Sequence, residues 1–226
     1  MPTTFEFTPA WKSAFPGAHA GVLVLREVVN PERHAGLEKV KEDLVEELRL
    51  RYAGLDRPGL LALPDLQAYH AYYARFKKTY HVQLQLESIL FRGKSIPAGA
   101  ALVEAMFMAE VKAMLLTAGH DLDFLKLPAR LDVSTGSEIY TTMRGESQQL
   151  KPGDMMISDS EGIISNIIYG PDQRTRIRPE TRNVLYTVYA PSGIQAATVV
   201  EHLGQIEAYV RLFAPRAVRE MLEVFG

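Results

Sequence analysis

The sequence predicts an α+β protein in which helices pack on a mostly antiparallel sheet. Helical periodicity dominates the first half of the chain, and from Leu127 onward short β-rich segments alternate with turns marked by glycines. The 226 residues, 47% of them hydrophobic and 23% charged, suffice to bury one large core. Because the chain has no internal repeat, low-complexity run or long linker, we expect a single domain over residues 1–226.

The first elements are expected to be two strands and a long helix. Residues 3–7 and 20–29 fit strands, and the second segment is rich in β-branched residues. Asn30 and Pro31 then provide a helix start signal. The apolar residues of this helix recur at helical spacing up to Leu50, namely Leu37, Val40, Leu44, Val45 and Leu48. The charged residues between them predict a solvated face.

A connector at residues 54–64 precedes a second helix predicted at 65–78. Its aromatic residues recur three and four positions apart: Tyr69, Tyr72, Tyr73 and Phe76. This stripe fits a face buried in the core. The alternative is a platform for stacking nucleic-acid bases beside Lys77 and Lys78.

The centre of the chain is its most apolar part. We expect a short helix at 84–92, a turn at 93–97 and a long helix at 98–117 that is apolar nearly all round and therefore buried. Ala118 and Gly119 fit a left-handed cap at its end. Six strands are then predicted at 129–135, 137–143, 155–162, 163–170, 175–178 and 183–191, and helices at 197–213 and 216–225.

Composition and missing motifs exclude several classes of function. A net charge of −2 gives no global attraction to nucleic acid, so a polyanion would need a local basic patch. The lack of Cys excludes disulfides and thiolate metal sites and fits a cytoplasmic protein. Neither a signal peptide nor a membrane span is expected. Nucleotide-binding, zincin and α/β-hydrolase motifs are missing, and the six histidines lack ligand spacing, so we expect no cofactor and no metal.

A cationic segment follows the turn Gly170-Pro171-Asp172. Arg174, Arg176 and Arg178 alternate with Thr175 and Ile177, so an extended chain would place the three guanidinium groups on one face. Such a face suits a phosphate or carboxylate partner. The alternative is a solvated edge strand whose arginines prevent aggregation.

One histidine has carboxylates beside it. His120 stands with Asp121 and Asp123 on the turn expected after the buried helix, where a neighbouring acid could orient a general base. The alternative is that Asp121 or Asp123 caps a following turn while His120 is merely exposed.

Residues 76–193 resemble the B3/B4 domain, the tRNA-binding and editing module of the phenylalanyl-tRNA synthetase β chain. The likeness rests on residues 117–123, on Gly136-Ser137-Glu138 or Gly145-Glu146, on residues 153–159 and on Glu180-Thr181-Arg182-Asn183-Val184-Leu185. The N-terminal strand and helix resemble free-standing members of that family. The resemblance implies a B3/B4-like fold with N-terminal and C-terminal elements packed onto it.

The same resemblance implies an editing site that hydrolyses the ester of a wrongly attached amino acid. The implied catalytic residues are His120, Thr187 and Glu138. The implied substrate-binding residues are Tyr169, Gly170, Asp172, Arg174, Thr175 and Thr181, and the tRNA contacts are Arg174, Arg176 and Arg178. The family's histidine and glutamate positions hold Ala118 and Thr187 here, so the sequence leaves open whether the protein is an enzyme.

Three functions remain open. The protein could be an aminoacyl-tRNA deacylase acting in trans, a non-catalytic tRNA- or RNA-binding module, or a protein that binds a free amino acid in the same pocket. The expected partners are accordingly the acceptor end of tRNA or a free amino acid. The apolar residues Ile167, Ile168, Val184 and Leu185 fit either a pocket wall or ordinary sheet core.

Overall fold

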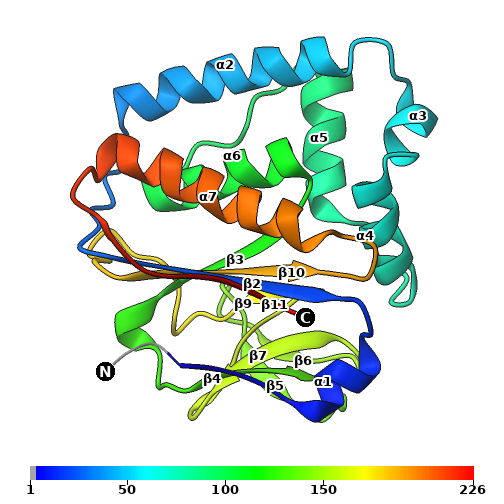
Figure 1. Ribbon diagram of the computed structural model, residues 1–226, viewed down its shortest axis with the longest axis vertical. Coiled ribbons are helices and arrows are strands. Elements are labelled where there is room, and N and C mark those ends of the chain that lie inside the picture. Colours follow the sequence, from blue (N-terminus) through cyan, green and yellow to red (C-terminus); the bar gives the residue numbers. More distant parts are fainter. Residues whose placement is uncertain (1–3) are drawn as a thin grey trace.

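The computed structural model describes residues 4–226 as a layer of helices above two β-sheets (Figure 1). The sheet nearer the helices has four strands in the order β11-β2-β10-β3, all antiparallel to their neighbours. These strands are β2 (His19–Arg26), β3 (Leu116–Asp121), β10 (Val184–Ala190) and β11 (Val218–Phe225). The order leaves β3 at one edge of this sheet.

The second sheet has five strands in the order β1-β4-β7-β8-β9. They are β1 (Phe5–Phe7), β4 (Ala129–Val133), β7 (Met155–Asp159), β8 (Gly162–Asn166) and β9 (Gly170–Pro171), and β5 (Ile139–Thr141) and β6 (Ser147–Gln149) form a separate hairpin. Strand β1 runs parallel to β4, and the other pairs of the sheet are antiparallel.

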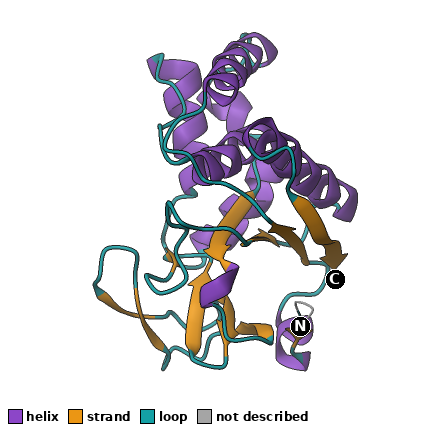
Figure 2. Cartoon of the chain, turned by 90° about the vertical axis from the view of Figure 1, so that its left-hand side faces the viewer, coloured by secondary structure: helices purple, strands orange, loops and turns teal. Residues whose placement is uncertain are grey.

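Most of the helices gather on one side of the four-stranded sheet (Figure 2). They are α2 (Ala35–Arg51), α3 (Arg57–Leu61), α4 (Pro64–Ala74), α5 (His81–Arg92), α6 (Ala101–Ala113) and α7 (Ala196–Phe213), whereas α1 (Pro9–Ala14) lies beside the second sheet. Helices α6 and α7 lie against the sheet face. The described residues thus form a mixed α+β fold with mainly antiparallel sheets, which confirms the predicted class.

The aromatic stripe of α4 is part of the core. Tyr69, Tyr72 and Tyr73 are buried, and their hydroxyl groups reach across to the sheets. The Tyr69 hydroxyl donates to the Tyr189 carbonyl at 2.5 Å and accepts from the Leu116 amide at 2.8 Å. The core interpretation is therefore confirmed, and a stacking platform on these rings is excluded because they are inaccessible.

The long helix predicted at 98–117 ends earlier. Helix α6 stops at Ala113, and Met114 caps it in the left-handed conformation with φ 59°. Ala118 and Gly119 lie inside strand β3 and cap no helix. The run that follows Met114 is apolar on every side, and such a run does not distinguish a buried helix from a buried strand.

The predicted C-terminal helix at 216–225 is wrong, because these residues form strand β11 beside β2. The segment contains good helix formers, but pairing with the open edge of β2 outweighs that local preference. The segment 175–178 is not a strand, so the arginines do not share a strand face. The predicted connector at 54–64 contains helix α3. Strands β6 and β9 were not predicted. Thr3 of the first predicted strand lies outside the described residues.

Candidate functional site

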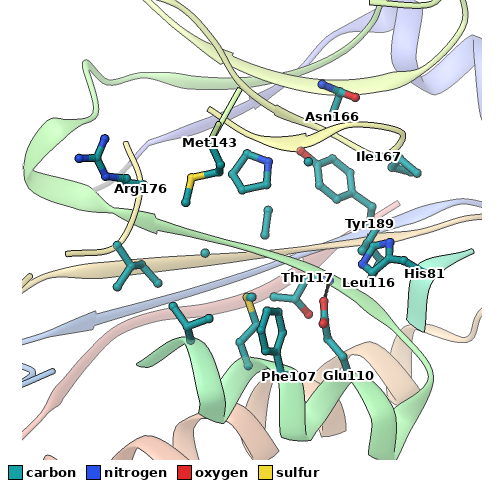
Figure 3. Close-up of a pocket in the computed structure, with 17 residues that line it drawn as sticks. His81, Phe107, Glu110, Leu116, Thr117, Met143, Asn166, Ile167, Arg176 and Tyr189 are labelled. Carbon is teal, nitrogen blue, oxygen red and sulfur yellow. Dashed lines mark hydrogen bonds between the residues drawn. The ribbon is translucent and has the colours of Figure 1, made fainter. Parts of the chain in front are cut away.

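A cavity of about 260 Å³ lies where the edge strand β3 meets the helices and the second sheet (Figure 3). Helix α6 contributes one wall with Val103, Met106, Phe107 and Glu110. The opposite wall comes from β8, β9 and the segment that joins them, namely Asn166, Ile167, Gly170 and Pro171. A side of the cavity is therefore the free edge of a sheet.

Two of the outward amides of β3 are bonded to other parts of the chain, at either end of the cavity wall. The Thr117 amide donates to Glu110 Oε1 at 2.8 Å, and the Asp121 amide donates to the Thr175 carbonyl at 2.7 Å. Between them lies Gly119. A Cβ atom at Gly119 would stand 2.8 Å from Ile177 Cδ1 and 3.3 Å from Met106 Sδ, so a larger residue here would displace the Ile177 side chain.

Glu110 is the acidic group of the cavity. Its side chain is 1% exposed, and while Oε1 accepts the Thr117 amide, Oε2 has no hydrogen-bond partner. Burial raises the pKa of Glu110 to about 8, so the carboxyl group is protonated at neutral pH. The nearby titratable groups are Tyr69, Tyr73, Tyr80 and the cavity residue His81, with His202 reached through Thr117.

Arg176 is the cationic group of the cavity, and it stands on the side opposite Glu110 (Figure 3). One of its nitrogens, Nη1, donates to the Gln173 carbonyl at 3.0 Å. The surface between the two charged residues is mainly apolar, with Met106, Phe107 and Ile177 among its residues. The site can therefore accommodate a small molecule with an apolar body and polar groups at both ends.

His81 is a cavity residue that the sequence analysis did not single out. It is the first residue of α5, and its Nδ1 lies 3.5 Å from the Tyr73 hydroxyl. Desolvation by the surrounding protein lowers the pKa of His81, although the residue remains open to solvent. Its ring is thus neutral at pH 7 and able to accept a proton. In the sequence it is one of six scattered histidines, and only its place at a helix start sets it apart.

His120 lies in β3 and is fully buried, so its predicted position on an exposed turn is wrong. Its Nδ1 is 2.8 Å from Thr175 Oγ1, and its Nε2 is 3.3 Å from Ser165 Oγ. Burial, reinforced by Arg174, lowers the pKa of His120 to about 3. The neutral ring connects β3, β8 and the arginine segment.

The carboxylates beside His120 bond elsewhere. Asp121 Oδ1 accepts the Asp123 amide at 3.1 Å and caps a single 3₁₀ turn, as the alternative interpretation expects. Its Oδ2 accepts the Thr181 hydroxyl at 2.6 Å. Asp172 in turn accepts the hydroxyl of Thr175. The predicted substrate-binding residues Asp172, Thr175 and Thr181 therefore form a buried polar network behind the cavity.

The other predicted site residues are dispersed. Thr187 is buried in β10 opposite Ala118, and Glu138 lies on an exposed loop where it accepts the Thr135 and Gly136 amides at 3.0 and 2.9 Å. Gly170 lines the cavity, and Tyr169 is its neighbour in the chain. Neither Thr187, Glu138 nor His120 is among the residues that line the cavity.

The three arginines largely bond to the protein itself. Arg174 donates to Asp159 at 2.8 Å, and Arg178 stacks over the Phe124 ring at 3.9 Å while donating to the Arg174 and Arg176 carbonyls. All three also line an open depression beside the cavity, together with Glu161 and Asp172. Only Arg176 borders both hollows, so it marks where they meet.

In the part of the chain that the structure describes, residues 4–226, no group of three or more histidines and carboxylates has an arrangement that could hold a metal ion. None of the helices in this part of the chain combines the length and the apolar character needed to cross a membrane.

The fold is similar to that of part of the β-subunit of an aminoacyl-tRNA synthetase. One similar solved structure is an N-terminal fragment of the phenylalanyl-tRNA synthetase β-subunit from Pyrococcus horikoshii, with a TM-score of 0.52 and 11% sequence identity. The similarity covers 100% of this chain and 55% of that chain. No family model matches, and no curated protein matches. At 11% identity the likeness concerns the fold alone.

Proposed function

We propose that this protein binds an aminoacyl group in the cavity beside β3 and releases it from tRNA, acting in trans in the cytoplasm. The observation that carries the proposal is the cavity itself, in which a mainly apolar surface separates Glu110 from Arg176. Its volume of about 260 Å³ suits a ligand of the size of one amino acid. A fold shared with part of an aminoacyl-tRNA synthetase is consistent with such a substrate.

The proposed reaction is hydrolysis of the ester between the amino acid and the terminal ribose of tRNA. Water attacks the ester carbonyl while the neutral ring of His81 accepts the water proton, and His81 then returns this proton to the ribose oxygen as the ester C–O bond breaks. His81 is suited to this role because it lines the cavity and remains open to solvent. Arg174, Arg176 and Arg178 are proposed to face the tRNA phosphates from the neighbouring depression.

The residues that the sequence predicted to be catalytic enter the proposal in a different way. His120 and Thr187 are buried in the strands that form the wall, and we propose that they keep the wall in place. Glu138 organises the loop before β5. A structural role and a catalytic role of these residues predict different results. Only a catalytic role predicts that substitution lowers turnover without lowering the stability of the protein.

A panel of mischarged and correctly charged tRNAs tests the proposal. We expect the purified protein to release amino acid from some of them, and His81→Ala to lower kcat by about 100-fold or more, as removal of a general base does. His70→Ala is the matched control, because His70 is exposed on α4 and lies outside the cavity. Lack of release from every charged tRNA would refute the proposal.

A second function, binding of a free amino acid without chemistry, is favoured by the sealed position of His120. In that case free amino acids should raise the unfolding temperature while charged tRNA remains intact. Affinity for tRNA that falls with salt, again without turnover, would instead support the binding-module alternative.

A further inference from the structure

We propose that a second basic surface, on the His81 side of the cavity, binds the tRNA phosphates next to the aminoacyl ester. This lysine surface consists of four cationic side chains on two segments of the chain, namely Arg75, Lys77, Lys78 and Lys151. The inference rests on the proposed function, because it names where the partner of the same site binds.

The positive charge of the lysine surface is not neutralised by the protein. Within residues 4–226, none of its four cations forms an ion pair. The open depression at this surface has no carboxylate among its residues, which are Arg75, Phe76, Lys77, Lys151 and Pro152. By contrast, Arg174 of the other basic depression forms ion pairs with Asp159 at 2.8 Å and with Glu161 at 3.4 Å. The lysine surface is therefore the stronger attraction for a phosphate group.

Asp154 is a buried carboxyl group next to this surface. It follows Gly153, whose carbonyl oxygen accepts Arg75 Nη2 at 3.3 Å. The two oxygens of Asp154 accept the Tyr72 hydroxyl at 2.7 Å and the Ile168 amide at 3.1 Å. Asp154 is thus bonded to the interior and leaves the exposed cations to a ligand.

Two of these cations are held in place by aromatic rings. The guanidinium carbon of Arg75 lies 5.4 Å from the centre of the Phe76 ring, and Lys78 Nζ lies 5.9 Å from the centre of the Tyr169 ring. Such contacts stabilise a cation and restrict its side chain. A phosphate that binds here therefore immobilises less of the protein than it would at unrestrained side chains.

The position of the lysine surface agrees with the proposed reaction. Lys78 is three residues before His81, and the Tyr169 ring that it contacts belongs to the neighbour of Gly170, which lines the cavity. Arg176 stands on the opposite side of the cavity from His81 (Figure 3). The ester must lie beside the base that activates the water, so the ribose and the phosphates nearest to it lie on the His81 side. The arginines are left with phosphates farther along the tRNA.

Fluorescence anisotropy of labelled, uncharged tRNA mixed with the full chain tests the inference. We expect Lys77→Glu, and separately Lys151→Glu, to weaken binding about ten-fold at 50 mM salt and to reduce the salt dependence of log Kd by about 1, the effect of losing one phosphate contact. Lys94→Glu is the matched control, because Lys94 is also exposed and lies beyond the other end of α5.

The kinetics of amino acid release provide a second readout. Lys77→Glu should raise KM for a charged tRNA about ten-fold and leave kcat unchanged, because a phosphate contact is the same in the ground state and in the transition state. A fall in kcat with unchanged KM would contradict the binding role.

The outcomes separate this inference from the proposed function. If charged tRNA is hydrolysed while Lys77→Glu and Lys151→Glu bind tRNA as tightly as Lys94→Glu, the inference is wrong and the proposed function stands. If binding depends on Lys77 and Lys151 but no charged tRNA is hydrolysed, the lysine surface remains an RNA site and the proposed reaction falls. If tRNA neither binds nor is hydrolysed, both fall. Urea unfolding of the two variants distinguishes lost affinity from lost folding.

Discussion

Glu110 couples the cavity to the stability of the fold. The folded protein holds a proton on this carboxyl group up to a pKa of about 8, whereas the unfolded chain loses it near the ordinary glutamate pKa of 4.5. The native state therefore binds more protons than the unfolded state between these values, and its contribution to stability falls as pH rises through this window. The burial of Glu110 should therefore be measurable as a decrease in the free energy of unfolding between pH 4.5 and 8.

We predict that Glu110→Gln removes this pH dependence, because the amide stays neutral while it can still accept the Thr117 amide. The variant should gain stability relative to the wild type as pH rises from 4.5 to 8, by up to a few kcal/mol, since each pKa unit corresponds to about 1.36 kcal/mol. Urea unfolding at several pH values measures the difference. Parallel pH curves for the two proteins would show that Glu110 ionises freely.

His120 is predicted to support the fold. His120→Ala leaves the Thr175 and Ser165 hydroxyl groups without this partner and should lower the free energy of unfolding by about 1–3 kcal/mol. The neutral buried ring binds no proton until the pH approaches 3, so the wild type should also lose stability as pH falls below about 6.5. Unchanged unfolding midpoints in urea would contradict this role.

At the residue scale, the sequence indicates which side chains are chemically reactive or charged more readily than where those side chains lie in the fold. His120 was selected from the sequence as a candidate residue. Its burial depends on strand β3, which was not predicted because its apolar residues continue those of the preceding helix. Glu110 was not singled out, although a carboxylate within a helix predicted to be apolar all round was a usable signal. The arginines were found too, whereas their bonds to Asp159 and to backbone carbonyls depend on tertiary contacts.

At the scale of elements, the packing of α7 on β2 depends on a glycine. A Cβ atom at Gly21 would stand 2.5 Å from Val199 and 3.0 Å from Leu203. We predict that Gly21→Ala lowers the free energy of unfolding by about 1–3 kcal/mol through overpacking. Urea unfolding at neutral pH measures the change.

Gly204 on the same helix is the matched control. A Cβ atom there meets nothing within 4 Å, so Gly204→Ala should stabilise α7 by about 0.5–1 kcal/mol. Equal effects of the two substitutions would show that helix propensity, and not the distance between α7 and β2, determines the result.

A helix or strand was predicted correctly where the residues of the segment itself determine its structure, and wrongly where contacts with distant segments determine it. Helices α2, α4, α5 and α7 carry local signals in the spacing of their apolar residues, and they were predicted within a few residues. The start signal predicted at Asn30 and Pro31 is wrong, because His34 caps α2 and Asn30 instead accepts the Leu102 amide at the start of α6. Strand β11 was mistaken for a helix because its strand state depends on β2, about two hundred residues earlier in the chain. The end of α6 at Met114 was missed because a left-handed methionine leaves no mark in the sequence.

At the scale of the whole molecule, the cavity joins three parts of the fold: α6, the edge of the four-stranded sheet and the β8–β9 end of the second sheet. A ligand that binds only this assembled state at 100 times its Kd should stabilise the protein by about 2.7 kcal/mol. We therefore predict a rise in the unfolding temperature on the order of 5–10 °C for the cognate amino acid. Differential scanning fluorimetry measures it, with Glu110→Gln as the comparison.

The fold class was predictable because it depends on the local patterns of many segments. The grouping of strands into two sheets was not, since β2 pairs with β10 and β11 and none of these partners is near it in the sequence. The cavity is formed by that grouping, so its location became visible only in the assembled structure.

The pairing of β2 also affects how the chain reaches its folded state. Strand β2 is synthesised well before its partners β10 and β11, which begin at residues 184 and 218. At about 5–20 residues per second, the apolar segment from Val22 to Leu25 waits on the order of 10–40 s for both neighbours. During translation, this apolar segment therefore lacks both of its strand neighbours and is prone to aggregate, and closing such distant contacts makes folding slow.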